Sequence, residues 1–325
     1  MPPMLRRLNH NMLALDGPDH GRLRTLVHKA FTPSMIERMR DQVQLLTNEL
    51  LDKVEPHASM DLIADFALPL PLTMIIRILG IPAQDAPMFR RWARRFLAGG
   101  ASIDRILLIP TMLSFAGYLK KLIKTRLARP GDDLITALAQ AREDRDQLSE
   151  DEILAMILLL LIAGHETTVN LIGSGILALL EHPDQLARLR SEPELIKPAI
   201  EELLRFVCPL VMATERYARE DITLEGVTIP RGELVVAVIG SANRDPRYFE
   251  EPDMLDITRE KNKHLAFGQG VHYCLGAPLS RMEGQIAIKT LVQRMPDLRL
   301  AIPAQQLHWR GNLVMRGLEA LPVLF

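Results

Sequence analysis

The sequence is poor in cysteine. Its 325 residues contain two cysteines, Cys208 and Cys274, which lie far apart in the chain. Two widely spaced thiols exclude a disulfide framework and are typical of a protein in a reducing compartment. The paired C-x-x-C spacing that most cysteine-based zinc sites use is also absent from the sequence.

The chain also lacks an excess of charge of either sign. Lys and Arg total 39 and Asp and Glu total 40, which gives a formal net charge of −1. A nearly neutral chain gives no electrostatic basis for binding nucleic acid, so no nucleic-acid partner is expected. The composition, 48% hydrophobic and 24% charged, predicts a globular protein with a sizeable core.

Targeting and linker signals are missing as well. The sequence shows no secretion signal, no Pro/Gly/Ser-rich linker and no internal repeat. The apolar run at 153–163 covers eleven residues, which is too short to span a membrane. We therefore expect one cytoplasmic domain over 1–325, without a membrane anchor.

The pattern of apolar residues predicts a mainly α protein with small β-sheets. Strands and loops are expected from about 208 to 270, with a hairpin between 222–229 and 234–239 across Pro-Arg-Gly. Short strands are expected at the C-terminus. The predicted helices cover residues 19–31, 34–54, 60–79, 84–97, 104–127, 132–141, 149–180, 183–190, 195–207 and about 274–294.

The run FGQGVHYCLG, residues 267–276, carries the strongest chemical signal. It places Cys274 in a glycine-rich loop that opens directly into the pattern of a helix. The glycines Gly268, Gly270 and Gly276 allow conformations and close approaches that a side chain forbids. A sulfur at a helix N-terminus faces unpaired N–H groups and the positive end of the helix dipole, and both effects favour the thiolate over the thiol.

The residues alone leave three interpretations of Cys274 open. It is a buried structural cysteine, a zinc ligand together with His272 and His264, or the single axial ligand of a haem iron. A nucleotide-binding loop fits worst, because the third glycine of G-x-G-x-x-G falls on Tyr273.

A second unusual segment, AGHETT at 163–168, interrupts the predicted central helix. Ser149 and Glu152 form a capping box at its start, and the apolar run that follows predicts burial on all sides. Gly164 and four polar residues are unfavourable inside such a helix. The segment is either a functional site or a kink whose polar groups are satisfied locally.

Three weaker signals have ordinary explanations of their own. Glu202 and Arg205 share a helix face, which is typical of a solvated surface pair. His20 and Arg24 lie one helical turn apart and can present donors to one anion, or form a solvated basic face. Arg216, taken alone, is a strand-edge arginine facing water.

Together these segments resemble the cytochrome P-450 family. FGQGVHYCLG fills every fixed position of the family pattern F-G-x-G-x-H-x-C-x-G, and AGHETT is similar to [AG]-G-x-[DE]-T-[TS]. The resemblance runs from Asp16 to the C-terminus with the motifs in the family's order. It implies the P-450 fold, in which haem b (iron protoporphyrin IX) lies between the central helix and the ligand loop.

The resemblance implies a role for each matching residue. Cys274 is the proximal ligand of the iron, and Glu166 and Thr167 deliver protons to dioxygen. Glu202 and Arg205 become an internal pair that joins Arg259 and positions the ligand loop. The other implied cofactor-binding residues are His20, Arg24, Ala163, Gly164, Arg216, Phe267, Gly268, His272 and Gly276.

The implied function is a haem-thiolate monooxygenase that inserts one oxygen atom of O₂ into a hydrophobic small molecule. The regions expected to line the pocket, 89–109, 210–214 and 313–314, indicate only a hydrophobic substrate. The resemblance to soluble bacterial members of the family implies a polyketide, macrolide, terpenoid or fatty-acid scaffold. NAD(P)H supplies electrons through a reductase and a separate ferredoxin- or flavodoxin-type donor. The alternatives are a haem-binding protein without turnover and a peroxide-using enzyme, which the Glu166–Thr167 pair disfavours.

One feature departs from the family pattern. Fifteen residues precede Asp16, whereas family members carry a β-rich segment before the corresponding helix. We therefore expect an N-terminally truncated single domain. Its expected parts are a helical lobe at 16–207, a β-rich segment with the haem-ligand loop at 208–276, and a C-terminal helix with strands at 277–325.

Overall fold

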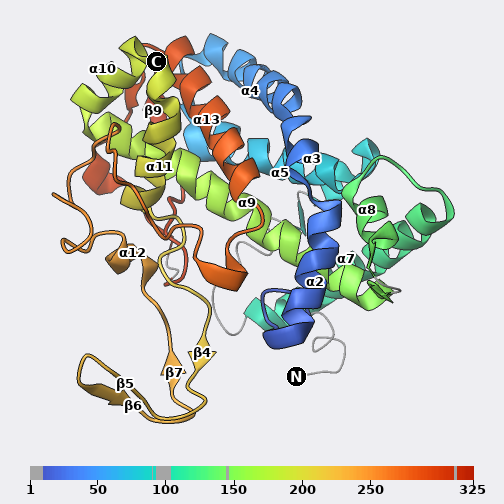
Figure 1. Cartoon of the computed structure of the whole chain (residues 1–325). Helices are drawn as coiled ribbons and strands as arrows, with labels where there is room; N and C mark the ends of the chain where they lie inside the picture. Colours follow the sequence, from blue (N-terminus) through green and yellow to red (C-terminus); the bar gives the residue numbers. More distant parts are fainter. Residues whose placement is uncertain (1–9, 90, 93–103, 144–145, 311–312) are drawn as a thin grey trace.

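A long helix, α9 (Glu150–Glu181), crosses the middle of the molecule (Figure 1). The structure is a computed structural model that describes residues 10–89, 91–92, 104–143, 146–310 and 313–325. The predicted capping box starts α9: the Ser149 hydroxyl accepts from the Glu152 N–H, and the Ser149 N–H donates to Glu152 Oε2 at 2.8 Å. The helix ends before Pro183, because a residue that precedes proline is disfavoured in the α conformation.

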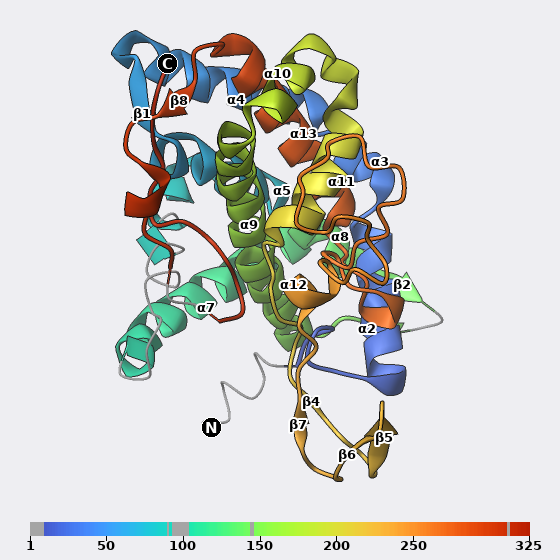
Figure 2. The same ribbon diagram turned by 90° about the vertical axis from the view of Figure 1, so that its left-hand side faces the viewer.

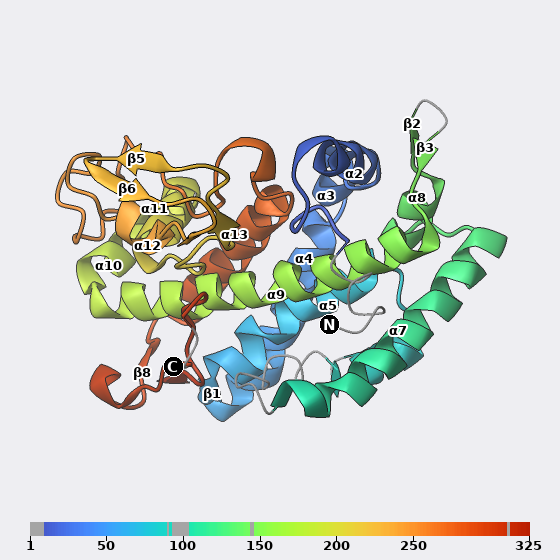
Figure 3. The ribbon, with the colours of Figure 1, turned by 90° about the horizontal axis from the view of Figure 1, so that it is seen from below.

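The other helices surround α9 along its length. Seen from below, α7 and α8 lie near its N-terminal end and α10 and α11 near its C-terminal end (Figure 3). The other helices are α2 (Gly17–Ala30), α3 (Pro33–Glu37), α4 (Arg40–Val54), α5 (Pro69–Ile78), α7 (Asp104–Ala128), α8 (Leu134–Gln140), α10 (Pro183–Ser191), α11 (Ile196–Val207), α12 (Ile239–Ala242) and α13 (Ala277–Arg294).

The sheets are small and antiparallel. β1, β9 and β8 pair in that order beside the C-terminus, with Met60 opposite Val323. The β4–β7 pair and the β5–β6 hairpin extend from the opposite end of the molecule (Figure 2). The strands are β1 (Ser59–Asp61), β2 (Arg142–Glu143), β3 (Asp146–Gln147), β4 (Arg216–Tyr217), β5 (Ile222–Leu224), β6 (Val227–Ile229), β7 (Leu234–Val235), β8 (Arg299–Leu300) and β9 (Pro322–Leu324).

The core lies where α5, α11 and α13 pack against α9. Leu171 and Ile172 of α9 are fully buried. At Gly173 the packing is so close that a Cβ would lie 2.3 Å from Ile63 Cδ1, so any larger residue would force the Ile63 side chain to move. The predicted fold class, mainly α with small β-sheets, is confirmed.

Two predicted helices are wrong in part. The helix expected at 60–79 begins instead as β1 and a π-helix, η2 (Leu62–Ala67), before α5. The reason is the partner strand β9, which local propensity cannot reveal. The helix expected at 34–54 divides into α3 and α4. The Met39 N–H donates to the Ile36 carbonyl, three residues back, and this tighter 3-10 type of bond interrupts the α-helix between them.

Two further boundaries differ. The hairpin expected between 222–229 and 234–239 is wrong: 222–229 folds back on itself, while β7 pairs with β4. Glu225 and Gly226 both have positive φ, 49° and 80°, which suits a tight two-residue turn. Part of the helix expected at 84–97 lies outside the described residues, although 86–89 are helical.

The central helix differs from expectation on one face. Ile162 is 45% exposed and Ala163 is exposed as well, so α9 is not buried on all sides. Among the described residues α9 is also long and apolar enough to cross a membrane, but 61% of its apolar window is buried inside the fold. It is therefore a core helix with one open stretch.

Candidate active site

The loop before α13 holds Cys274 in a fixed turn. Gly268 and Gly270 have φ values of 69° and 76°, a region that favours glycine. The Cys274 N–H donates to the Phe267 carbonyl at 2.9 Å. The helix begins three residues later than Cys274, at Ala277, and not at Cys274 as expected.

The thiol of Cys274 lies at the N-terminus of α13, as predicted. The backbone N–H groups of Gly276 and Ala277 and the charges of Arg24 and Arg281 all act to lower the pKa of this thiol. Burial is nevertheless the largest effect and raises the pKa of the thiol above its ordinary value. The helix N-terminus therefore favours the thiolate, as expected, but burial outweighs it, and a metal that binds here must displace the proton.

The structure weighs against a zinc site here. Within the part of the chain that it describes, no group of three or more His, Cys, Asp and Glu side chains could hold a metal ion. The second cysteine, Cys208, is buried, and burial raises its pKa to about 11. A metal bound at Cys274 must therefore take its remaining ligands from another group, as the iron of a haem does.

A carboxylate lies among cationic donors beside this loop. Nε2 of His272 donates to Oδ1 of Asp16 at 2.9 Å, and this hydrogen bond lowers the pKa of Asp16. The charges of Arg216 and His20 act in the same direction. The His20 and His272 rings lie 4.2 Å apart, and Arg24 donates to the Tyr273 carbonyl at 2.6 Å.

These donors fit the propionates of a haem. In the His272–Asp16 contact, a residue expected to bind a propionate already holds a carboxylate. His20 Nε2 is buried and has no hydrogen-bond partner among the described residues. Asp16 was missed from the sequence as part of this cluster, because its contact with His272 joins residues 256 positions apart.

The open stretch of α9 carries the second motif. Ala163 is exposed, Thr167 is half-buried and Glu166 is buried. The Thr167 hydroxyl donates to the Ala163 carbonyl at 3.1 Å, and His165 Nδ1 lies 2.6 Å from the Leu161 carbonyl oxygen. These bonds satisfy the Thr167 hydroxyl and one nitrogen of His165, whereas His165 Nε2 is buried without a partner among the described residues. The helix α9 continues through the segment.

Two contacts connect this motif to the rest of the site. The Thr168 hydroxyl donates to the Ser280 hydroxyl at 3.2 Å and joins α9 to the first turns of α13. Gly164 faces α5, where a Cβ would meet Ile75 Cδ1 at 3.6 Å, an ordinary contact. The predicted roles of Ala163, Gly164 and Thr167 toward a cofactor stay predictions.

The predicted internal pair is confirmed. Glu202 and Arg205 are fully buried and form two hydrogen bonds of 2.7 and 2.8 Å. Arg259 donates to Glu202 as well, at 3.1 Å. Arg205 also donates to the carbonyl of Asn243, whose side chain accepts from the Leu265 N–H just before the ligand loop. The interpretation as a solvated surface pair is wrong.

Sequence reasoning missed a second ion-pair network that holds the ligand loop. Glu201 accepts two hydrogen bonds from Arg281 at 2.7 and 2.8 Å, and His264 Nε2 lies 3.1 Å from it. The Arg281 guanidinium lies over the Phe267 ring at 4.5 Å and donates to the Tyr273 hydroxyl. The sequence did carry a signal for this second ion pair, since Glu201 directly precedes Glu202 in the same helix.

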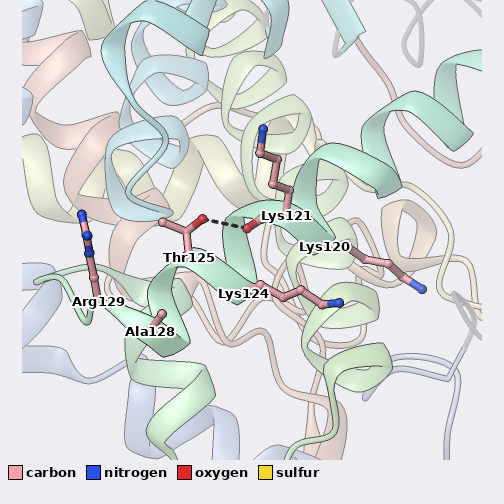
Figure 4. Close-up of a pocket in the computed structure, with 6 residues that line it drawn as sticks. All are labelled: Lys120, Lys121, Lys124, Thr125, Ala128 and Arg129. Carbon is pink, nitrogen blue, oxygen red and sulfur yellow. Dashed lines mark hydrogen bonds between the residues drawn. The ribbon is translucent and has the colours of Figure 1, made fainter.

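A shallow basic depression lies elsewhere, on α7 (Figure 4). None of the residues that line it belongs to α9, α13 or the Cys274 loop, so it takes no part in this site. Its lining residues are Lys120, Lys121, Lys124, Thr125, Ala128 and Arg129.

A helical fold with one thiol ligand beside carboxylate-binding donors is the arrangement of a haem-thiolate protein. A profile described as Cytochrome P450 matches residues 114–296. Cytochrome P450 CYP107DY1 of Priestia megaterium is 50% identical over 97% of this chain and 77% of its own length. The chain therefore belongs to the cytochrome P450 family. It is a monooxygenase that uses haem and oxygen.

Polyketide biosynthesis cytochrome P450 PksS of Bacillus subtilis is also similar, with 46% identity over 97% of this chain and 78% of its own. Its solved structure has a TM-score of 0.96 and 45% identity, covering 100% of this chain and 83% of that one. The structure of P450BioI with an acyl carrier protein ligated to hexadec-9Z-enoic acid has a TM-score of 0.92, with 43% identity. It covers 99% of this chain and 83% of that one.

Proposed function

We propose that this monooxygenase inserts one oxygen atom into a hydrophobic polyketide or fatty-acyl molecule in the cytoplasm, with haem b as its cofactor. The observation that carries the haem assignment is the place of Cys274, which the bond from its N–H to the Phe267 carbonyl holds in the loop just before α13. The likeness to PksS and to P450BioI supports the substrate class. Ile162 and Leu313, which are 45% and 80% exposed, offer apolar contact surface to such a molecule.

The chain's own residues would hold the cofactor at both its iron and its edge. Cys274 would bind the iron, and His20, Arg24, Arg216 and His272 would bind the propionates. When bound, the haem supplies the activation of dioxygen. Phe267, Gly268 and Gly276 shape the loop around the sulfur, and a Cβ at Gly276 would lie 4.0 Å from Sγ.

We assign proton delivery to Glu166 and Thr167. The Thr167 hydroxyl donates to a carbonyl of its own helix, which leaves its oxygen able to accept from a water molecule. Burial raises the pKa of Glu166, so its carboxyl can take up and release a proton nearer to neutral pH. Ala163, exposed beside them, leaves open backbone for substrate and oxygen.

The electron donor is proposed to be a ferredoxin- or flavodoxin-type protein that a reductase loads from NAD(P)H. Arg24 and Arg281 lie near enough to Cys274 for their charges to act on its sulfur. Because Arg281 is already paired with Glu201, Arg24 would supply the positive charge that attracts an acidic donor toward the Cys274 loop.

The experiment is a carbon monoxide difference spectrum of the reduced protein. The wild type and Cys208→Ala, the matched control, are expected to give the band of a thiolate-ligated haem. Cys274→Ala is expected to lose it. An unchanged band in Cys274→Ala would exclude Cys274 as the ligand. Binding of acyl chains and polyketides, followed as a spectral change of the wild-type haem, then tests the substrate class.

A further inference from the structure

A cation from the C-terminal segment contacts the carboxyl group of Glu166. Nη1 of Arg310 donates to Glu166 Oε1 at 3.3 Å. The Glu166 side chain is 10% exposed and the Arg310 side chain 25%, so the ion pair joins a buried carboxyl to the surface. We infer that Arg310 is a positioning residue, which orients Glu166 for proton delivery and favours its ionised form. This inference rests on the proposed function.

The backbone fixes where Arg310 lies. Its N–H donates to the Gly317 carbonyl at 2.9 Å, and Trp309 and Leu318 form an antiparallel bridge beside it. The Arg316 guanidinium lies 4.4 Å from the centre of the Trp309 ring, on the same turn. Arg310 therefore reaches Glu166 from a turn whose two sides, at 309–310 and 317–318, are hydrogen-bonded to each other.

The same turn packs directly against α9. A Cβ at Gly317 would lie 2.0 Å from Oδ1 of Asn170, so a larger residue would disturb the contact between the turn and the Asn170 side chain. Asn170 follows Glu166 by one helical turn and is buried. The position of the Arg310 guanidinium thus depends on the contact between Gly317 and Asn170.

The charges around Glu166 favour this role. Burial raises the pKa of Glu166, and the charge and hydrogen bond of Arg310 act against that effect. Burial lowers the pKa of its neighbour His165, and Arg310 lowers it further, while the hydrogen bond with the Leu161 carbonyl acts in the opposite direction. Among the described residues, Arg310 is the charged group that acts on Glu166. Without it, the carboxyl would shift further toward its protonated form.

The test combines a direct titration with turnover. The carboxyl carbon of Glu166 is followed by carbon-13 NMR against pH in the diamagnetic ferrous carbonyl protein, and its signal is identified by its loss in Glu166→Gln. We expect the Glu166 titration to move to higher pH in Arg310→Gln and to return toward wild type in Arg310→Lys. Arg316→Gln, the matched control on the same turn, is expected to leave it in place.

The share of NAD(P)H electrons recovered in product gives the functional readout. As pH is lowered, this share should begin to fall at a higher pH in Arg310→Gln than in the wild type. The double variant Glu166→Gln/Arg310→Gln should give the same product share as Glu166→Gln alone. Gly317→Ala should shift the titration in the same direction as Arg310→Gln. A titration unmoved in Arg310→Gln, or losses that add in the double variant, would overturn the inference. An unaltered product share in Glu166→Gln would instead overturn the proposed proton delivery.

Discussion

Glu202 and Arg205 form an ion pair with no exposed side-chain surface, and Arg259 joins it from a distant loop. Glu202 also accepts from the Asp256 N–H and the Asn262 side chain. Removing the charges of Glu202 and Arg205 from water costs free energy, and only the full set of hydrogen-bond partners offsets that cost. It therefore holds the chain between α11 and the ligand loop in one arrangement.

Glu202→Gln should reveal that dependence. The change leaves the buried Arg205 and the partly buried Arg259 facing a neutral amide, so the free energy of unfolding should fall by about 3–5 kcal/mol. Denaturant unfolding of the haem-bound protein measures it. Glu37→Gln, which breaks the exposed Glu37–Arg40 pair, is the control and should leave stability nearly unchanged. Equal losses in the two variants would contradict the structural role of Glu202.

Thr167→Ala should divert electrons from product to hydrogen peroxide. The hydroxyl lies on the open stretch of α9, and its loss removes the group assigned to hold the relay water. Product and peroxide are both measured per NAD(P)H consumed. Thr168→Ala is the matched control, because that hydroxyl joins Ser280 on α13 and is buried. An unchanged product share in Thr167→Ala would remove Thr167 from the relay.

Glu283 should make stability depend on pH. It is buried in α13, its Oε2 has no partner within the described part of the chain, and burial raises its pKa to about 8. Between its ordinary pKa of 4.5 and 8, the unfolded chain releases a proton that the folded protein keeps. The free energy of unfolding should thus fall as pH rises, by up to about 1.4 kcal/mol per pH unit.

Glu283→Gln removes the titrating group and should flatten the pH dependence over that interval. Denaturant unfolding at a series of pH values measures the slope, and Glu250→Gln, at an exposed position, serves as the control. A Glu283→Gln protein that keeps the wild-type slope would show that another group is responsible.

Glu201 should act on the acid side. Burial raises its pKa, but His264 and Arg281 outweigh that effect and lower it to about 2. Its contribution is complete above the unfolded value of 4.5 and is lost as pH falls toward 2. Glu201→Gln should lower stability at neutral pH by roughly 1.5–3 kcal/mol and lose less on acidification. Equal acid sensitivity of the variant and the wild type would contradict this role.

The sequence predicts features whose signals are local. The Ser149–Glu152 capping box gave the start of α9, and the spacing of Glu202 and Arg205 placed them on one helix face. The conformations of Gly268 and Gly270 also followed from residue type. Each of these depends on neighbours within a few positions, where helix and turn geometry is fixed.

Long-range contacts could not be predicted in this way. The Arg310–Glu166 bond joins residues 144 positions apart, and β1 forms because the C-terminal strand returns to it. The state of the Cys274 thiol depends on how deeply the folded chain buries it, and burial outweighed the helix N-terminus. Such outcomes follow from tertiary packing, which cannot be inferred from residue type and local spacing alone.

The central claim is a bond between the Cys274 sulfur and the haem iron. X-ray absorption at the iron K-edge counts sulfur neighbours of the iron directly. The account predicts one sulfur neighbour in the wild type and in Cys208→Ala, and none in Cys274→Ala. A wild-type iron surrounded only by nitrogen and oxygen, or a sulfur neighbour that persists in Cys274→Ala, would contradict it.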